Sequence, residues 1–413
     1  MSTVYRRCCG IDIHKETAVI CVLAPDGEEG KLIVKRYGTL KNELSRVRGW
    51  LKLLRVTDIA IESTGVYWIP VWNMLEGHGF RLVLANAGQV KALQGRKSDN
   101  RDCQRLAEFL QDRRLDSSFV PPPEIRQLRQ LMRLRQSLLE QRNEVHNQIR
   151  DLLETANIKL SSVVSDLMGV SGQRILNALA QGVDSPEQLS WKARGKLRAK
   201  EREIREAMKS NFKEFHRWTL QALLRHYDFL TAQVDLFESQ IAEHMLPYQE
   251  QVALLSTIPG VNKIVAWSLI AELGLDMSVF PTAAHCASWA GVAPGTHESA
   301  GKLMSGATKK GNRYLRRILA QAAWATTRCK QGYLKAFFQR IKSRRGWSKA
   351  IVAVAHKILV FAYSILRDKQ PYMDLGESYF DQLNPDKALR RIMERIDRLG
   401  FSATITRKEQ LAT

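Results

Sequence analysis

Acidic residues are scarce in this sequence, and one long stretch has none. The 413 residues include 42 Asp and Glu against 63 Lys and Arg, a formal net charge of +21 at pH 7. Between Glu298 and Asp368 no acid occurs, where the average composition of the chain would place about seven. A positive excess of this size favours a polyanionic partner, nucleic acid first and an anionic membrane second, over a merely soluble basic protein.

Zinc-ligand motifs, a secretory signal and a membrane-spanning run are also missing. The six cysteines form no Cys-x-x-Cys pair and no histidine cluster accompanies them, which excludes a zinc ribbon and predicts reduced thiols. No long apolar run follows the N-terminal residues, so a secretory signal is not expected. The most apolar stretch, 350–366, contains His356 and Lys357 and is short for a bilayer. We therefore expect a buried helix there, no membrane partner and a cytoplasmic protein.

Residues 1–120 have the pattern of an α/β domain. The expected strands form a meander followed by β-α-β alternation, which fits a mixed sheet flanked by helices. The segments that carry this pattern are two strands within 9–23, a third at 31–37, a helix over 42–54, and short apolar strands at 58–62 and 81–85.

The rest of the chain is predicted to be all-α. Residues 121–250 hold two long runs of three- and four-residue apolar spacing. These runs predict a coiled coil, within one chain or between chains, or else two bundle helices of one subunit. Residues near 160–215 separate the runs and are a candidate insertion. A mostly helical domain is expected over 251–370, followed by a tail over 371–413 with one amphipathic helix.

Four acids stand out by their context. Asp12 lies between isoleucines in the first strand, and Glu62 closes a short apolar strand. Asp99 and Asp102 lie three residues apart where a helix begins, so both carboxylates share one helix face. Taken singly, each acid is also explained as a strand end, a helix cap or a first-turn residue. As an ordered set in a basic protein they predict a site for divalent cations, Mg²⁺ above all, with two ions promoting phosphodiester chemistry.

This order of motifs resembles a known enzyme family. The segments Gly-Ile-Asp12-Ile-His-Lys, Ile-Glu62-Ser-Thr-Gly and Lys-x-Asp99-x-x-Asp102 are similar to those of the DEDD-type insertion-sequence transposases, the insertion-sequence-110 family. The resemblance implies an RNase H-like (RuvC-like) N-terminal domain in which these four acids are the catalytic metal ligands. It also implies a C-terminal transposase domain that carries a nucleophilic serine.

The acid-free stretch contains the segment that resembles the second block of this family. Within 294–302 the small residues Ser299, Ala300 and Gly301 precede a lysine. By the resemblance, Ser299 attacks the scissile phosphate and forms a transient phosphoserine link to DNA. The residues alone leave Ser305 and Thr308 as rivals, and a serine that only binds phosphate as an alternative. The loop holds no clear general base, and the resemblance implies that the metal site of one subunit meets the serine loop of another.

Two features of the C-terminal domain predict contact with DNA. Residues 255–273 have the pattern of a helix-hairpin-helix, whose turn at Gly260 would present backbone amides to one phosphate without reading sequence. Basic residues of the acid-free stretch are expected to neutralise further phosphates. Those nearest the serine segment are Lys302, Lys309, Lys310, Arg313, Arg316 and Arg317.

The sequence therefore predicts a site-specific DNA recombinase, a transposase that excises and inserts a mobile element. The resemblance adds a structured bridge RNA that pairs with donor and target DNA, and a bacterial or archaeal, nucleoid-associated setting. Recombination needs at least two active sites held together, so a homodimer or homotetramer is expected. The alternatives are a RuvC-like structure-specific nuclease without a covalent intermediate, and a nucleic-acid scaffold with a degenerate site. The intact set of four acids argues against the scaffold.

Overall fold

The computed structural model describes residues 7–23, 32–63, 65–85, 99–295, 297–299, 302–305, 307–308 and 310–404. The chain divides into two compact units, Met1–Val120 and Pro121–Thr413. Lys309 lies outside the described residues, and so do the side chains of Asp99, Ser299, Lys302 and Ser305.

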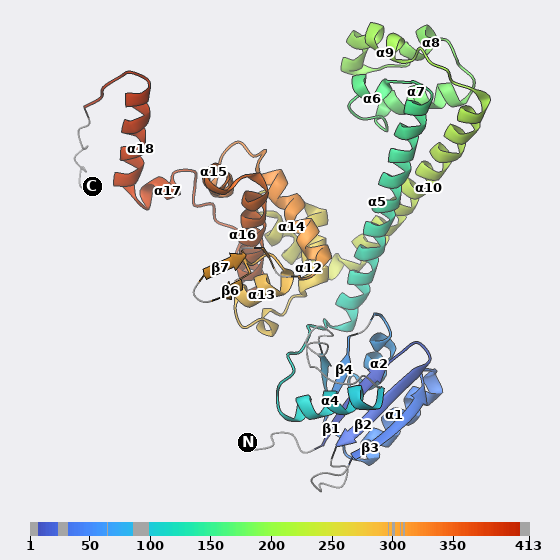
Figure 1. Ribbon diagram of the computed structural model, residues 1–413, viewed down its shortest axis with the longest axis vertical. Helices are drawn as coiled ribbons and strands as arrows, with labels where there is room; N and C mark the ends of the chain where they lie inside the picture. Colours follow the sequence, from blue (N-terminus) through green and yellow to red (C-terminus); the bar gives the residue numbers. More distant parts are fainter. Residues whose placement is uncertain are drawn as a thin grey trace. The chain divides into compact units, whose positions relative to one another are not determined.

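The first unit is built on a five-stranded mixed sheet (Figure 1). Its strands are β1 (Cys8–Ile13), β2 (Thr17–Leu23), β3 (Leu32–Gly38), β4 (Asp58–Glu62) and β5 (Arg81–Ala85). In the order β3-β2-β1-β4-β5, the first three strands form an antiparallel meander, and β4 and β5 continue parallel to β1. All five strands lie where the sequence predicted them, and the topology fits an RNase H-like fold.

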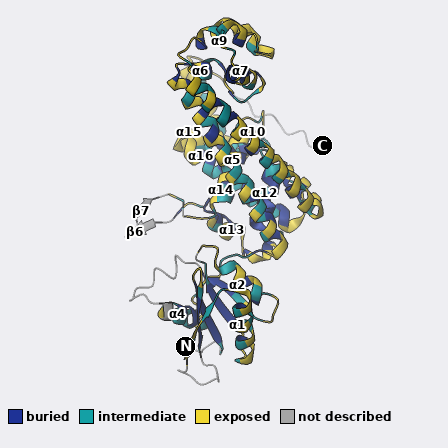
Figure 2. Ribbon diagram, turned by 90° about the vertical axis from the view of Figure 1, so that its right-hand side faces the viewer, coloured by how far each residue is buried: buried dark blue, intermediate teal, exposed yellow. Residues whose placement is uncertain are grey.

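Helices cover both faces of this sheet. They are α1 (Lys41–Leu53), α2 (Trp68–Leu75) and α4 (Asp99–Gln111). Because side chains alternate along a strand, Cys9, Ile11 and Ile13 of β1 join the core that includes α1 and α2. Cys8 faces the other way and joins the smaller core built with α4. The strands β1, β2 and β4 are therefore buried on both sides, as the dark blue strands of Figure 2 indicate, and an acid in the central strand β1 is a costly feature.

Two long helices begin the second unit. α5 (Pro123–Thr155) and α10 (Glu214–His244) have 33 and 31 residues and pack against each other. Arg135 near the start of α5 donates from Nε to Glu238 near the end of α10 at 2.8 Å, so the helices run antiparallel. The two predicted apolar runs thus pair within one chain.

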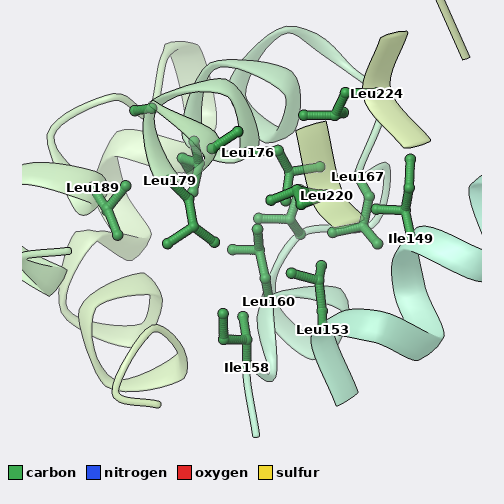
Figure 3. Close-up of a cluster of buried hydrophobic side chains, with 14 of the residues drawn as sticks. Ile149, Leu153, Ile158, Leu160, Leu167, Leu176, Leu179, Leu189, Leu220 and Leu224 are labelled. Carbon is green, nitrogen blue, oxygen red and sulfur yellow. The ribbon is translucent and has the colours of Figure 1, made fainter. Parts of the chain in front are cut away.

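The residues between these helices form a small helical cap, which we define as residues 156–213. Its elements are α6 (Leu160–Val163), α7 (Val170–Ala180), α8 (Pro186–Ser190), the 3₁₀ helix η1 (Gly195–Lys200) and α9 (Glu201–Ala207). Their apolar side chains share one buried core with the adjoining ends of α5 and α10 (Figure 3). Backbone hydrogen bonds from Lys159 to Ala207 (2.9 Å) and from Asn211 to Ala156 (3.0 Å) join the two ends of the cap.

A compact group of helices and one hairpin follows. Its elements are η2 (Leu246–Tyr248), α11 (Gln249–Ser256), α12 (Lys263–Leu273), η3 (Met277–Val279), α13 (Ala283–Ala290), β6 (His297–Ser299), β7 (Lys302–Ser305), α14 (Arg313–Thr326), α15 (Tyr333–Arg345) and α16 (Trp347–Asp368). α16 is the one described helix that is long and apolar enough to span a membrane, and 56% of its apolar window is buried. It packs against α11, α13, α14 and α15, which confirms the predicted buried helix. The tail carries α17 (Tyr379–Gln382) and the amphipathic α18 (Pro385–Arg398).

Candidate active site

Asp12 and Glu62 lie on adjoining strands of the first unit. β1 and β4 are parallel and in register, with Ile11 opposite Ile61. The next residue on each strand is the acid, so both acids lie at the carboxyl edge of the sheet and on the same face. Asp12 is 5% exposed, and the Nε2 of the exposed His14 is 3.5 Å from its Oδ2. A buried carboxylate at a strand edge is the kind of group that metal binding can compensate.

The helix with the other two acids packs against the same part of the sheet. α4 contacts β1, β2 and β4, and Cys103 of this helix is fully buried. The Asp12 carboxylate is close enough to Cys103 to be one of the charges that raise the pKa of this thiol, after hydrogen bonding to Cys21 and burial. Asp102 is the neighbour of Cys103, and Asp99 is the first residue of α4. The start of α4 thus lies over the acidic edge of β1.

The donor chemistry of this region fits a hard divalent cation. Carboxylate oxygens are the ligands that Mg²⁺ prefers, and Asp12, Glu62 and Asp102 carry such oxygens on three elements. Among the described side chains, which leave out that of Asp99, no three His, Cys, Asp or Glu lie close enough together to hold a metal ion.

Gly10 permits the close approach of α4, and its substitution gives a test. A Cβ at residue 10 would lie 2.0 Å from the carbonyl oxygen of Cys103 and 2.7 Å from the amide nitrogen of Ala107. Gly10→Ala is therefore expected to displace α4, to lower the free energy of unfolding by about 1–3 kcal/mol and to impair strand exchange. The matched control is Gly49→Ala in α1, where nothing lies within 4 Å, and there alanine should stabilise by about 0.5–1 kcal/mol. Equal unfolding midpoints in urea for the two variants would contradict this packing.

The serine candidates of the second unit lie on a two-stranded antiparallel hairpin. β6 and β7 pair with Ser299 opposite Lys302 and His297 opposite Ser305. Ser299 therefore ends β6 at the turn of the hairpin, next to a basic residue, whereas Ser305 lies at the base. Below the hairpin, Pro294 bridges to Thr308, and Gly295 donates to the carbonyl of Ala307 at 3.0 Å.

Basic side chains surround the start of α14, just after the hairpin. Asn312 caps the helix by accepting from the amides of Tyr314 and Leu315, both at 3.1 Å. Three arginines lie in the first two turns and none of the first-turn residues is acidic. Cations at a helix N-terminus are electrostatically unfavourable because the helix dipole is positive there. A bound anion would neutralise both the side-chain charges and the positive end of the dipole. The exposed side chains of this surface are Lys310, Arg313, Arg316 and Arg317.

Gly260 has a packing role that the sequence did not reveal. It lies in the turn between α11 and α12 with φ +86°, and a Cβ there would lie 2.4 Å from the carbonyl oxygen of Ala322 in α14. Asn262 then caps α12 by accepting from the amide of Val265 at 3.0 Å. The expected pair of helices is present, and its glycine is required by contact with α14 whether or not the turn binds phosphate.

Two family models match the chain. A DEDD-type model described as "Transposase" matches residues 9–158, and one described as "Transposase IS116/IS110/IS902 family" matches residues 252–339. Together these regions include the four acids, Gly260, the hairpin and the start of α14. The chain belongs to the IS110 family of transposases. It is therefore a DNA transposase, and its DEDD domain implies dependence on a divalent metal ion.

Curated relatives support this assignment. The transposase for insertion sequence element IS1111A of Coxiella burnetii is 23% identical over 390 residues, which cover 88% of this chain and 90% of that protein. The transposase for insertion sequence element IS1533 of Leptospira borgpetersenii is 24% identical over 380 residues, 88% of this chain and 96% of its own length. A pilin gene-inverting protein of Moraxella bovis is 28% identical over 152 residues, 36% of this chain and 47% of that protein.

A buried ion-pair network joins α5 and α12 to the start of α14, and it was missed in the sequence. Glu272 of α12 is 3% exposed. Its two carboxylate oxygens accept from Nε and one Nη of Arg133 at 2.8 and 2.9 Å, and Oε2 also accepts from the Asn312 amide at 2.6 Å. Arg129 lies 3.4 Å from the same carboxylate, and burial lowers the pKa of its guanidinium to about 10. Glu272 thus ties α5 and α12 to the residue that caps α14.

Removing this carboxylate should destabilise the second unit strongly. Glu272→Ala leaves Arg129 and Arg133 without their shared partner, so the free energy of unfolding is expected to fall by about 3–5 kcal/mol. The matched control is Glu238→Ala, which breaks the pair with Arg135 at a side chain that is 36% exposed. There we expect a cost of about 0–1 kcal/mol. Similar shifts of the thermal midpoint for both variants would show that Glu272 is not the anchor of this region.

Proposed function

We propose that this transposase is a site-specific recombinase that excises and inserts its element through a covalent phosphoserine intermediate. In this proposal Asp12, Glu62, Asp99 and Asp102 hold two Mg²⁺ ions, and Ser299 is the nucleophile. The observation that carries it is the register of β1 and β4, which places Asp12 and Glu62 side by side beneath the start of α4. Two acids at one strand edge concentrate negative charge, which a divalent cation can neutralise.

The chemical role of each group follows from phosphodiester exchange. Bound Mg²⁺ supplies charge neutralisation at the scissile phosphate and lowers the barrier to attack by a hydroxyl. Ser299 Oγ loses its proton and bonds to phosphorus, while the bond from phosphorus to one ribose oxygen breaks and that oxygen takes up a proton. A hydroxyl of a second strand then displaces the serine by the reverse exchange. Each step trades one phosphate ester for another, so no external energy source is needed.

The place of Ser299 on the hairpin favours it over its rivals. The turn of a two-stranded hairpin can enter a DNA groove, and there Ser299 lies opposite Lys302. Ser305 pairs with His297 at the base, and Thr308 belongs to the bridge below. In the proposal, Lys302, Lys309, Lys310, Arg313, Arg316 and Arg317 hold the phosphates on either side, and the turn at Gly260 binds one more.

The partners follow from the same reaction. Donor and target DNA must be held together, so we propose that the protein acts as a homodimer or homotetramer. The bridge RNA implied by the family resemblance would select the sites, since phosphate contacts position a duplex without reading its sequence. We expect this recombination to take place in the cytoplasm of a bacterium or archaeon, at the nucleoid.

Strand exchange in a defined system tests the proposal. Full-length protein, the transcribed flank of the element as RNA, and plasmids carrying the element ends and a target are incubated with Mg²⁺. We expect joined products of defined junction sequence, and their loss on chelation of the metal. Cleaved but never joined DNA would instead support the structure-specific nuclease.

A further inference from the structure

The cap carries a basic segment that the transposase chemistry does not use. Residues 191–200 read Trp-Lys-Ala-Arg-Gly-Lys-Leu-Arg-Ala-Lys, with five cations and no acid. This segment lies between the two regions that the family models match, 9–158 and 252–339. It is therefore a feature of this chain for which the family assignment offers no role.

The backbone of this segment is fixed in place. Leu189 and Ala193 are buried in the cap core at 1% and 2% exposure. The amide of Arg194 donates to Oγ of the buried Ser171 at 2.8 Å, and this hydroxyl donates back to the carbonyl of Arg194 at 3.3 Å. The segment then forms η1. Ordered cations lose less conformational entropy on binding than cations on a loose tail.

Within the continuously described range 99–295, one of the five cations of this segment pairs with an acid: Lys200 lies 3.8 Å from Glu203. Across the same range, no ion pair is formed by Lys192, Arg194, Lys196 or Arg198. Elsewhere around the cap, Lys209 pairs with Glu206 at 2.8 Å and Lys159 pairs with Glu154. A solvated face normally mixes both signs, so a cluster of unpaired cations points to an anionic partner.

Trp191 adds an exposed aromatic ring to these charges. It is 62% exposed, and its Nε1 donates to Glu201 Oε1 at 3.1 Å. Because that bond uses the only donor of the indole, the surface that remains exposed is apolar. An ordered aromatic ring beside unpaired cations is the combination that stacks on an unpaired base while the adjoining phosphates are neutralised.

We propose that residues 191–200 of the cap bind a single-stranded segment of nucleic acid. Arg194, Lys196 and Arg198 contact its phosphates, and Trp191 stacks on one of its bases. Duplex is disfavoured at the tryptophan because paired bases do not offer a free face. This second nucleic-acid site belongs to the cap and not to the serine hairpin, and it would hold a strand without cutting it.

Binding by the full-length protein tests the base contact. A fluorescent 20-nucleotide single strand, made both as RNA and as DNA, and its duplex are titrated at several salt concentrations. Trp191→Ala should weaken binding of the tighter single strand about tenfold and leave the duplex unchanged, while Trp191→Phe keeps most of the affinity. Unchanged affinity of Trp191→Ala for both single strands would overturn the stacking contact.

The phosphate contacts are tested by salt dependence. The triple variant Arg194→Ala, Lys196→Ala, Arg198→Ala should reduce the slope of log K against log salt by about two. The control removes equal charge from the acid-paired cations Arg150, Lys159 and Lys209, and should change the slope less. Equal reductions of the slope in the two triple variants would overturn the proposal, because binding would then depend on the overall positive charge of the protein and not on this segment. Ser299→Ala should bind the same single strand as tightly as the wild type. The affinity measurement therefore still tests this site if Ser299 is shown not to be the nucleophile.

Discussion

Asp12→Ala is expected to lower strand exchange on the order of 10⁴-fold, without loss of folded protein. The carboxylate is 5% exposed at the carboxyl edge of β1, beside Glu62 on β4 and below α4. Its removal deletes one metal ligand at the centre of the proposed site, and with it the charge neutralisation on which attack at a phosphate depends. Joined product from an excision plasmid measures the effect, and circular dichroism measures the folded fraction.

Asp58 provides the matched control for Asp12. It is also 5% exposed and lies in the same sheet, but at the opposite end of β4. There it accepts from the Thr57 hydroxyl at 2.6 Å and lies 3.5 Å from Arg81. Asp58→Asn should keep strand exchange near the wild-type rate per folded molecule. If both substitutions lowered the rate equally, burial of an acid in the sheet would explain the loss and the metal site would not.

Ser299→Ala is expected to abolish strand exchange, because alanine has no hydroxyl with which to form the proposed covalent link to DNA. Ser305→Ala, at the base of the same hairpin opposite His297, should retain activity within about tenfold because the backbone pairing is unchanged. The same excision assay measures both. Retained strand exchange in the Ser299 variant would sink the proposed nucleophile, and nicked but unjoined DNA in that variant would support metal-dependent hydrolysis by water.

The strands that carry Asp12 and Glu62 were predictable because their signals are local. Polar and apolar residues alternate on both sides of the turn at residues 14–16, which predicted two strands. Asp12 was identified as a candidate because an acid between two isoleucines of a strand is costly to bury. The sequence did not reveal that β1 and β4 pair in parallel, because β2, β3 and α1 separate them along the chain. The close packing of Gly10 on Cys103 was not predictable, because it depends on the depth at which α4 lies against the sheet.

Glu272 could have been found by the rule that marked Asp12. It stands alone in the apolar run from Val265 to Leu273, and a lone acid there requires a partner. Its partner Arg133 is 139 residues away in the chain. The sequence could therefore indicate that Glu272 needs a partner, but not which residue the partner is. The cap was marked only as an insertion, because helices of four or five residues such as α6 and α8 are too short to display a helical period.

The most direct test of the serine nucleophile is to trap and map a protein–DNA adduct. Wild-type protein is incubated in Mg²⁺ with donor DNA that carries a nick near the scissile phosphate, so that the released strand diffuses away before rejoining. The product is denatured, digested and sequenced by mass spectrometry. We expect a phosphodiester link between DNA and Ser299, which disappears in both Ser299→Ala and Asp12→Ala. An adduct at another residue, or joined DNA with no adduct under trapping conditions, would contradict it.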